Sequence, residues 1–345
     1  MIRAFRRKMN PACFQGGGRS GPYFEGWYYK LVTADGDRAL AVIPGLFVDE
    51  RGDGGHAFIQ VFDGRSNRTH YIRFPRAGFA SRDGVFDVTI GGSRFTAERL
   101  ALDARSEDCA IAGTLSFTGL SPWPRTLISP GIMGWYSWVP FMECYHGVIS
   151  LDHGIEGALT LDGEEIDFTG GRGYIEKDWG VSFPEAWIWC QCNHFSFPGS
   201  SLTGSVAIIP WIRRPFPGFI FGLQHDGTLH RFTTYTGARL RAFEVDDAEV
   251  HCVLTRKEHT LEITASRAPG GTLWAPTLRG MTHEISESMA STVRVQLTET
   301  RGGRSTVLLR DTGRHAGFEV AGDMQRLLAM HRQDGGYANN NIGKE

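Results

Sequence analysis

Short apolar runs alternate with glycine-containing turns along almost the whole chain. The runs are rich in Val, Ile, Phe, Trp and Thr, and turns such as Asp35-Gly36, Asp63-Gly64 and Asp83-Gly84 separate them. Short strands at near-regular spacing, joined by Asp-Gly turns, are typical of antiparallel sheets. We therefore predict an all-β protein. The clearest predicted strands are 39–48, 57–62, 70–74, 85–90, 110–117, 141–151, 157–168, 202–209, 219–223, 228–235, 242–245, 249–255, 260–266, 292–300, 305–310 and 317–321.

Apolar residues at helical spacing occur in only one segment, 323–332, which is the single helix that the pattern predicts. Residues 1–20 show little periodicity and are glycine-rich near their end, which predicts an N-terminal arm. Strand content is similar on both sides of a central motif near residue 180. We therefore predict two barrel-like β domains, 21–180 and 181–335, followed by a tail at 336–345.

The central stretch, 171–180, is unusual because charged and aromatic residues alternate within it. If this stretch is extended, its side chains point alternately to the two faces of a sheet. One face then carries Tyr174, Glu176 and Asp178. The other face carries Ile175, Lys177 and Trp179. Two carboxylates about 7 Å apart in a partly desolvated place favour keeping one of them protonated near neutral pH, as an acid catalyst requires.

The next apolar run repeats this alternation with aromatic and amide side chains. One face carries Trp187, Trp189, Gln191 and Asn193. The opposite face carries the two thiols of Cys190 and Cys192. A purely structural core strand rarely alternates two indoles with two amides, so this row predicts a surface that binds a ligand.

Composition and charge exclude several classes of protein. With 345 residues, 41% of them hydrophobic, the chain is long enough for two domains with separate cores. A formal charge of −2 provides no basic excess for nucleic acid. No apolar run approaches the roughly 18 residues that a membrane span needs. The six scattered cysteines are typical of reduced thiols, so we expect a cytoplasmic protein. The histidines, among them His56, His70 and His194, have no ligand spacing, and no metal site is predicted.

Several motifs together resemble the tocopherol cyclase family. They are residues 23–30, residues 173–180, Phe183-Pro184 with the Trp187 row that follows, and the later segments 274–276 and 317–320. The resemblance spans roughly residues 23 to 322, and the two aromatic-acidic motifs, in this order and at this separation, are specific.

The resemblance implies two lipocalin-like β-barrel or sandwich halves with a deep apolar cavity, few short helices and no cofactor. Members of this family close a chromanol ring on a prenylated hydroquinone by protonating an alkene of the prenyl chain. Bacterial carotenoid hydratases, which are more distantly similar, carry a Tyr and an acidic residue two positions later, before Asn-Trp-Gly. Tyr174 and Glu176 match those positions, but Asp178 stands where the hydratases carry Asn. This leaves open whether Glu176 or Asp178 is the acid.

The implied chemistry gives each candidate residue a role. Alkene protonation needs a carboxylic acid kept neutral in a dry site, and aromatic faces that stabilise the cation. Glu176 or Asp178 would be the acid, and Tyr174 would hydrogen-bond to it or relay its proton. His146 would accept the phenolic proton or orient the hydroquinone. The expected substrate-binding residues are Glu25, Trp27, Trp187, Trp189, Gln191 and Asn193.

Structural roles compete with several of these assignments. Lys177 and Asp178 would form an ion pair at the surface or at a domain joint. Glu25 would be a buried carboxylate that bonds backbone amides. His146 would be a satisfied core histidine.

Three functions are therefore open. The first is a cyclase of prenylated phenols, and the second is a related hydratase or cyclase that acts on another isoprenoid or a polyketide. The third is a non-catalytic lipid-binding protein. The ligand expected for the cyclase is an apolar, prenylated small molecule, and no nucleic acid is involved. Peripheral membrane contact stays open, since so apolar a substrate has to be delivered from a membrane, and the sequence does not set the oligomeric state.

Overall fold

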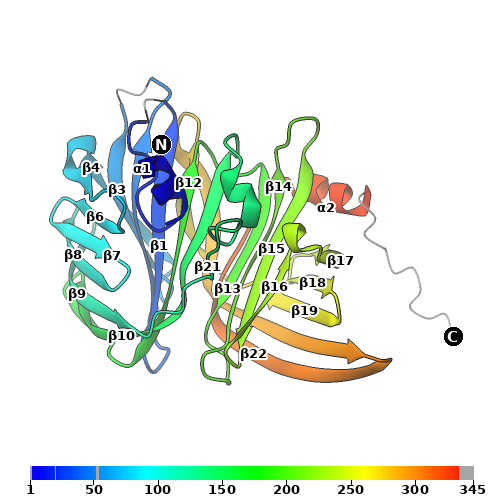
Figure 1. Ribbon diagram of the computed structural model, residues 1–345. Coiled ribbons are helices and arrows are strands. Elements are labelled where there is room, and N and C mark those ends of the chain that lie inside the picture. The colour runs from blue at the N-terminus through cyan, green and yellow to red at the C-terminus, as the bar shows by residue number, and fades with distance from the viewer. Residues whose placement is uncertain (1, 20, 52–53, 334–345) are drawn as a thin grey trace. The chain divides into compact units, whose positions relative to one another are not determined.

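The computed structural model describes residues 2–19, 21–51 and 54–333, and the predicted tail at 336–345 lies outside these residues (Figure 1). The prediction of an all-β protein is confirmed, because the described residues form two large antiparallel sheets and few helices. Short 3₁₀ turns lie at Arg76–Gly78, Gly134–Trp138 and Thr234–Thr236. No helix in these residues is both long and apolar enough to cross a membrane.

The first sheet has the strand order β4-β3-β2-β1-β12-β10-β9-β8-β7-β6-β5, and β11 pairs with β10 at its side. Its strands are β1 (Tyr23–Val32), β2 (Ala39–Val48), β3 (His56–Asp63), β4 (Arg68–Pro75), β5 (Phe79–Ser81), β6 (Asp87–Ile90), β7 (Ser93–Thr96), β8 (Arg99–Arg105), β9 (Ala110–Thr118), β10 (Cys144–Leu161), β11 (Glu164–Asp167) and β12 (Gly171–Gly180). The central motif is therefore a strand in the middle of this sheet, between β1 and β10.

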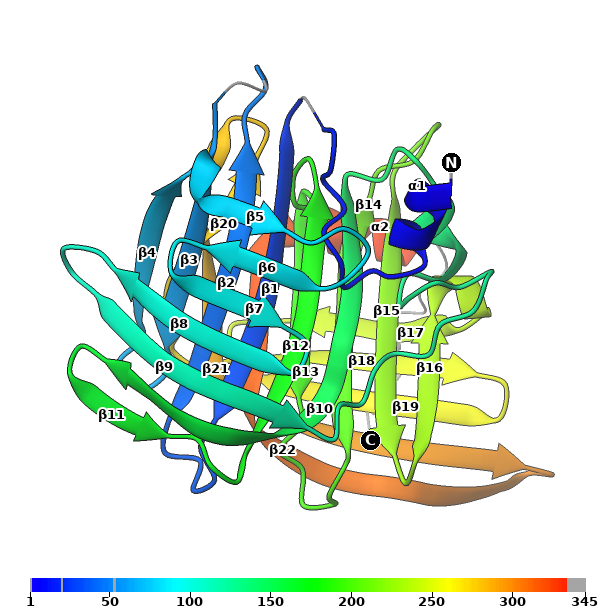
Figure 2. The same ribbon diagram turned by 60° about the vertical axis from the view of Figure 1, so that its left-hand side comes forward.

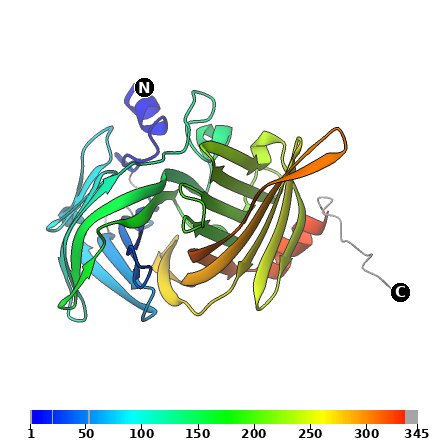
Figure 3. The same ribbon diagram turned by 90° about the horizontal axis from the view of Figure 1, so that it is seen from below.

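The second sheet has the order β16-β15-β14-β13-β22-β21-β19-β18-β17, and β20 pairs with β21. Its strands are β13 (Ala186–Cys192), β14 (Ser201–Ile209), β15 (Phe216–His225), β16 (Thr228–Thr233), β17 (Arg239–Val245), β18 (Glu249–Arg256), β19 (His259–Ser266), β20 (Gly271–Thr277), β21 (Gly280–Arg301) and β22 (Arg304–Gly322). The long β21–β22 hairpin extends beyond the neighbouring strands (Figure 3).

The chain divides into two compact units. The first comprises the described residues up to Phe183 together with Pro269–Glu287, and the second comprises Pro184–Ala268 together with the described residues from Ser288 onward. Strand β20 and the first residues of β21, which we call the β20 hairpin, thus belong to the first unit, although the residues before them in the chain belong to the second unit. One cause is Gln60, whose amide accepts a hydrogen bond from the backbone N–H of Trp274 (2.8 Å) and donates one to its carbonyl (3.0 Å).

The core of the first unit is enclosed by its own curved sheet. Strands β5–β7 lie in front of β1–β3 in Figure 2, and β3 contacts β6 although the two are far apart in strand order. Alternate residues of β1, among them Trp27, Tyr29 and Leu31, point into this core. Trp27 stacks on Phe86 with ring centroids 5.5 Å apart. The period-two alternation therefore separates a core face of the sheet from an opposite face.

The second unit has a separate core, to which β13 contributes Ile188, Cys190 and Cys192. Helix α2 (Met324–Gln333) packs on β13, β15 and β17 with Leu327 fully buried, in agreement with the helix predicted at 323–332. The other helix, α1 (Ile2–Lys8), lies within the predicted N-terminal arm, where no apolar period predicts a helix.

Candidate functional site

Strand β12 presents three of the predicted catalytic residues on one face, and the neighbouring strand supplies the fourth. The Tyr174 hydroxyl donates a hydrogen bond of 2.5 Å to Oε2 of Glu176. His146 lies on β10 directly opposite Asp178, and its Nδ1 is 3.0 Å from Oδ1 of Asp178. The other ring nitrogen, Nε2, is 3.6 Å from Oε2 of Glu176. We call Tyr174, Glu176, Asp178 and His146 the acid cluster.

The two carboxyl groups of the acid cluster differ in their access to water. The Glu176 side chain is 6% exposed, whereas the Asp178 side chain is 26% exposed. Tyr174, which bonds to Glu176, is fully buried. Burial disfavours the charged form of a carboxyl group, and Glu176 is the more buried of the two.

The electrostatics of the acid cluster centre on His146. Burial acts to lower its pKa, but the charges of Asp178 and Glu176 and the hydrogen bond to Asp178 outweigh burial and raise the pKa to about 9. The imidazole is therefore protonated at neutral pH, which makes His146 a cation between two carboxyl groups. Ligand atoms of His146, Glu176 and Asp178 also lie within 4.8 Å of one another, so a divalent cation would compete with protons here.

Stability is expected to depend on pH through His146. Its pKa in the folded state, about 9, exceeds the ordinary value of 6.5, so protonation stabilises the folded protein by a free energy on the order of 3 kcal/mol. This contribution is complete below about pH 6.5 and is lost as the pH rises through about 9. Urea unfolding of the native chain and of His146→Gln between pH 6 and 10 measures it. The difference in free energy of unfolding between the native chain and His146→Gln should shrink as the pH rises. A difference that stays constant would contradict a raised pKa for His146.

Two further predicted residues, Glu25 and Trp27, lie on the opposite face of the first sheet, with Lys177. Lys177 and Glu25 form a fully buried ion pair with a distance of 2.5 Å between Nζ and Oε1. Lys177 also donates to the backbone carbonyls of Pro11 (2.9 Å) and Cys13 (2.6 Å). Its ammonium group lies 4.9 Å from the ring centroid of Trp27 and 4.6 Å from that of Trp179.

Glu25 holds the segment that precedes β1. Its carboxylate accepts the backbone N–H groups of Gln15 (2.9 Å) and Gly16 (3.0 Å), and the hydroxyl of Tyr23 also donates to it. This is the arrangement that the structural alternative for Glu25 describes. Lys177 pairs with Glu25 across the core face, while Asp178 belongs to the acid cluster on the other face. The sheet itself therefore separates Glu25 and Trp27 from the acid cluster.

Sequence reasoning did not select two residues that share the face of the acid cluster. Tyr28 is the register partner of Glu176 on β1, so their side chains are neighbours. The Tyr28 hydroxyl donates a 2.5 Å hydrogen bond to Oε1 of the buried Glu287 on β21. Only the register could have identified Tyr28, and no local pattern marks Glu287, because its strand returns to the first unit from far along the chain.

The remaining predicted residues lie in the second unit, three of them on β13 and Asn193 directly after its end. Trp187, Trp189, Gln191 and Asn193 are buried and lie on the face opposite the thiols that enter the core. Nε1 of Trp187 donates a 2.7 Å hydrogen bond to Oε2 of Glu319 on β22. Oδ1 of Asn193 is 3.0 Å from Nδ1 of His194. The alternation expected for this strand is therefore present, and the role of the row in substrate binding stays a prediction.

Comparison with known proteins identifies relatives of the chain. A family model described as tocopherol cyclase-like matches residues 104–322. The probable chloroplastic tocopherol cyclase of Oryza sativa subsp. japonica is 32% identical over 203 residues, which cover 55% of this chain and 42% of that protein. The chloroplastic tocopherol cyclase of Zea mays is 31% identical over 205 residues, or 55% and 41% of the two chains. The chain thus matches less than half the length of these curated relatives.

Among solved structures, the crystal structure of CghA has a similar fold. The similarity has a TM-score of 0.50 at 13% sequence identity and covers 87% of this chain and 88% of that one. At this identity the likeness concerns the fold alone, and it agrees with the all-β architecture described above.

Proposed function

The chain belongs to the tocopherol cyclase-like family, and from this premise we propose that it closes an oxygen-containing ring on a prenylated phenol by protonating a prenyl alkene. The observation that carries the proposal is the acid cluster, in which a buried carboxyl group is bonded to a phenol and lies beside a protonated imidazole. This arrangement provides a buried carboxyl group and, beside it, a protonated imidazole that can supply its proton.

In the proposed reaction, Glu176 is the acid. In the reactive form the proton that His146 and Glu176 share lies on the Glu176 carboxyl group, and His146 is neutral. Tyr174 donates to Oε2 of Glu176, which holds the carboxyl group in one orientation. Transfer of this proton to the alkene forms a C–H bond and leaves a tertiary carbocation. The phenolic oxygen then forms the C–O bond of the new ring and loses its proton. The substrate is isomerised, and no atom is gained or lost overall.

Proton return is the proposed role of His146 and Asp178. Asp178 accepts the phenolic proton, and His146, which lies between the two carboxyl groups, passes a proton on to Glu176. General acid–base groups of this kind contribute about 10²–10⁴-fold to a rate. No cofactor is needed for this scheme, and the absence of one stays a prediction.

Incubation with a phytylated hydroquinone in deuterated water tests the function. We expect a cyclised product that carries one non-exchangeable deuterium on carbon, detected by mass spectrometry, because the added proton comes from an acid that exchanges with solvent. A product heavier by one water would instead indicate a hydratase. Unchanged substrate that remains bound to the protein through gel filtration would support the lipid-binding alternative and would contradict the proposal.

A further inference from the structure

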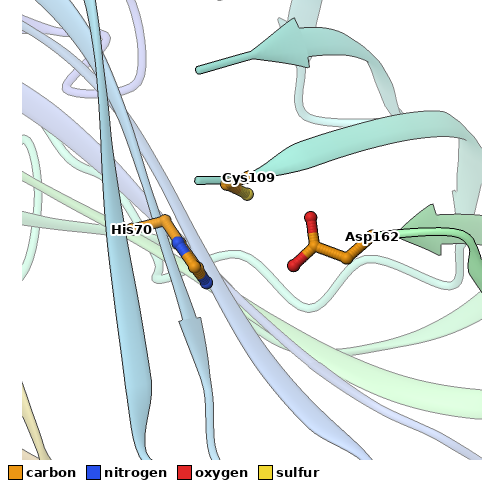
Figure 4. Close-up of side chains that lie close together, drawn as sticks. All are labelled: His70, Cys109 and Asp162. Carbon is orange, nitrogen blue, oxygen red and sulfur yellow. The ribbon is translucent and has the colours of Figure 1, made fainter. Parts of the chain in front are cut away.

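Three side chains of types that bind metals lie close together at another place in the first unit. None of them belongs to the acid cluster. His70 lies on β4, Cys109 in the turn between β8 and β9, and Asp162 in the turn between β10 and β11. Figure 4 shows the three side chains close together, with the Asp162 carboxylate directed toward the other two. One ligand atom from each lies within 4.8 Å of the other two.

The surroundings hold these three side chains in place. His70 and Cys109 are almost fully buried, whereas Asp162 is exposed. Nδ1 of His70 is 3.2 Å from a carboxylate oxygen of Asp108, the kind of partner that fixes the ring orientation of metal-binding histidines. Oδ1 of Asp162 accepts the backbone N–H of Ala110 at 2.7 Å, and the Asp162 N–H donates to the Ala110 carbonyl at 2.8 Å. The turn that carries Asp162 is thus tied to the residue that follows Cys109.

We propose that His70, Cys109 and Asp162 form a binding site for a thiophilic divalent cation of the zinc class. Imidazole, thiolate and carboxylate together are a typical donor set for Zn²⁺, and the thiolate discriminates against Mg²⁺ and Ca²⁺. Zn–S bonds of about 2.3 Å and Zn–N bonds of about 2.0–2.1 Å place tetrahedral ligand atoms about 3.5 Å apart. Side chains whose ligand atoms are within 4.8 Å reach this spacing by a small closure, for which the exposed Asp162 has room.

Cation binding at this site releases a proton. Burial and the neighbouring charges of Asp162 and Asp108 raise the pKa of the Cys109 thiol to about 12, so the thiol is protonated at neutral pH. The cation replaces the thiol proton, which is released to solvent, forms a metal–sulfur bond, and takes water as a further ligand. With one thiolate and one carboxylate, the site neutralises a divalent charge.

The bound cation would act as a structural cross-link. It would join β4, which is an edge strand of the first sheet, to two turns formed by strands further along that sheet. A cation that binds only the folded state stabilises it by mass action. This role does not rest on the proposed cyclase function.

The test is Co²⁺ titration of the metal-free protein, followed by the thiolate-to-cobalt charge-transfer absorption. We expect one Co²⁺ per chain with this absorption, displacement by Zn²⁺, and a higher melting temperature in the presence of Zn²⁺. Cys109→Ser should abolish the charge-transfer band. Loss of a residue that only supports a metal ligand typically weakens metal binding about 10–100-fold. His70 and Asp162 are proposed as ligands themselves, so His70→Gln and Asp162→Asn should each weaken Co²⁺ binding at least ~10-fold.

Matched controls separate this site from other thiols and from the acid cluster. Cys252 is also a buried thiol whose pKa is raised to about 12, but it belongs to the second unit, so Cys252→Ser should leave the titration unchanged. A charge-transfer band that survives Cys109→Ser, or no band at all, would overturn the proposal. Cation binding that disappears in His146→Gln and persists in Cys109→Ser would place the metal at the acid cluster and would also overturn it. If Cys109→Ser does not fold, Asp162→Asn still tests the site, because Asp162 lies in an exposed turn where the substitution should leave the fold intact.

Discussion

Glu176→Gln is expected to lower the turnover of a prenylated hydroquinone at least ~100-fold while the protein stays folded, since losing a general acid costs about 10²–10⁴-fold. The amide is close in shape to the carboxyl group and can still accept the hydrogen bond from Tyr174, but it has no proton to give. Steady-state assays and circular dichroism of the native chain and the variant measure the two effects separately. The loss should appear in kcat and not in KM, because the amide has nearly the same size and shape as the carboxyl group and so leaves substrate binding almost unchanged.

Two further variants make the Glu176 result specific. Asp178→Asn should lower kcat less than Glu176→Gln, because the more exposed Asp178 is proposed only to accept and return a proton. Glu165→Gln, at an exposed position on β11, should have no effect. A larger loss for Asp178→Asn than for Glu176→Gln would make Asp178 the acid. Full activity in both variants would remove the carboxyl groups of β12 from the mechanism altogether.

Lys177→Met is expected to reduce the free energy of unfolding by about 3–5 kcal/mol, the usual cost of leaving one charge of a buried ion pair without its partner. Glu25 would then be a buried carboxylate without a counterion, and the carbonyls of Pro11 and Cys13 would lose their donor. Urea denaturation measures the loss. Glu25→Gln should cost a similar amount, since it leaves the buried ammonium group unpaired.

An exposed ion pair in the same sheet provides the control for Lys177→Met. Arg94 bonds Asp87 with a distance of 2.8 Å between Nε and Oδ1, and its side chain is 60% exposed. Arg94→Gln should reduce the free energy of unfolding by only about 0.2–1 kcal/mol. The same measurements also decide between the two roles of Glu25. If Glu25→Gln raises KM and leaves stability unchanged, Glu25 binds substrate and the structural interpretation is wrong.

The period-two alternation was the most informative property of the sequence. It predicted which residues of β12 and β13 share a face, and it did so without any tertiary information, because successive side chains of a strand always point to opposite faces. It could not state which face of β1 lies beside Glu176. That depends on the register, which pairs Tyr28 with Glu176 and so turns Glu25 and Trp27 toward the core.

The alternation of polar and apolar residues could not predict contacts between residues that are far apart in the sequence. His70, Cys109 and Asp162 have no common spacing, and β4 is not a neighbour of β8, β9 or β10 in the strand order, so only the folded sheet brings the three side chains together. Glu287 reaches Tyr28 because the β20 hairpin returns to the first unit, held in part by Gln60. Hydrophobic patterning indicates that a strand exists, but it carries no information on which distant strand becomes its neighbour.

The pairing of β1 with β12 has a consequence for how the chain is synthesised. Strand β1 emerges from the ribosome early, with β2–β4 directly after it, whereas its other neighbour ends at Gly180. Until then one edge of β1 is unpaired, and Glu25 has no counterion, because Lys177 has not yet been made. Pairings between such distant strands are slow to form and leave edges open to aggregation. Nascent chains of this protein that stop before β12 should therefore depend on chaperones more than chains that extend past it.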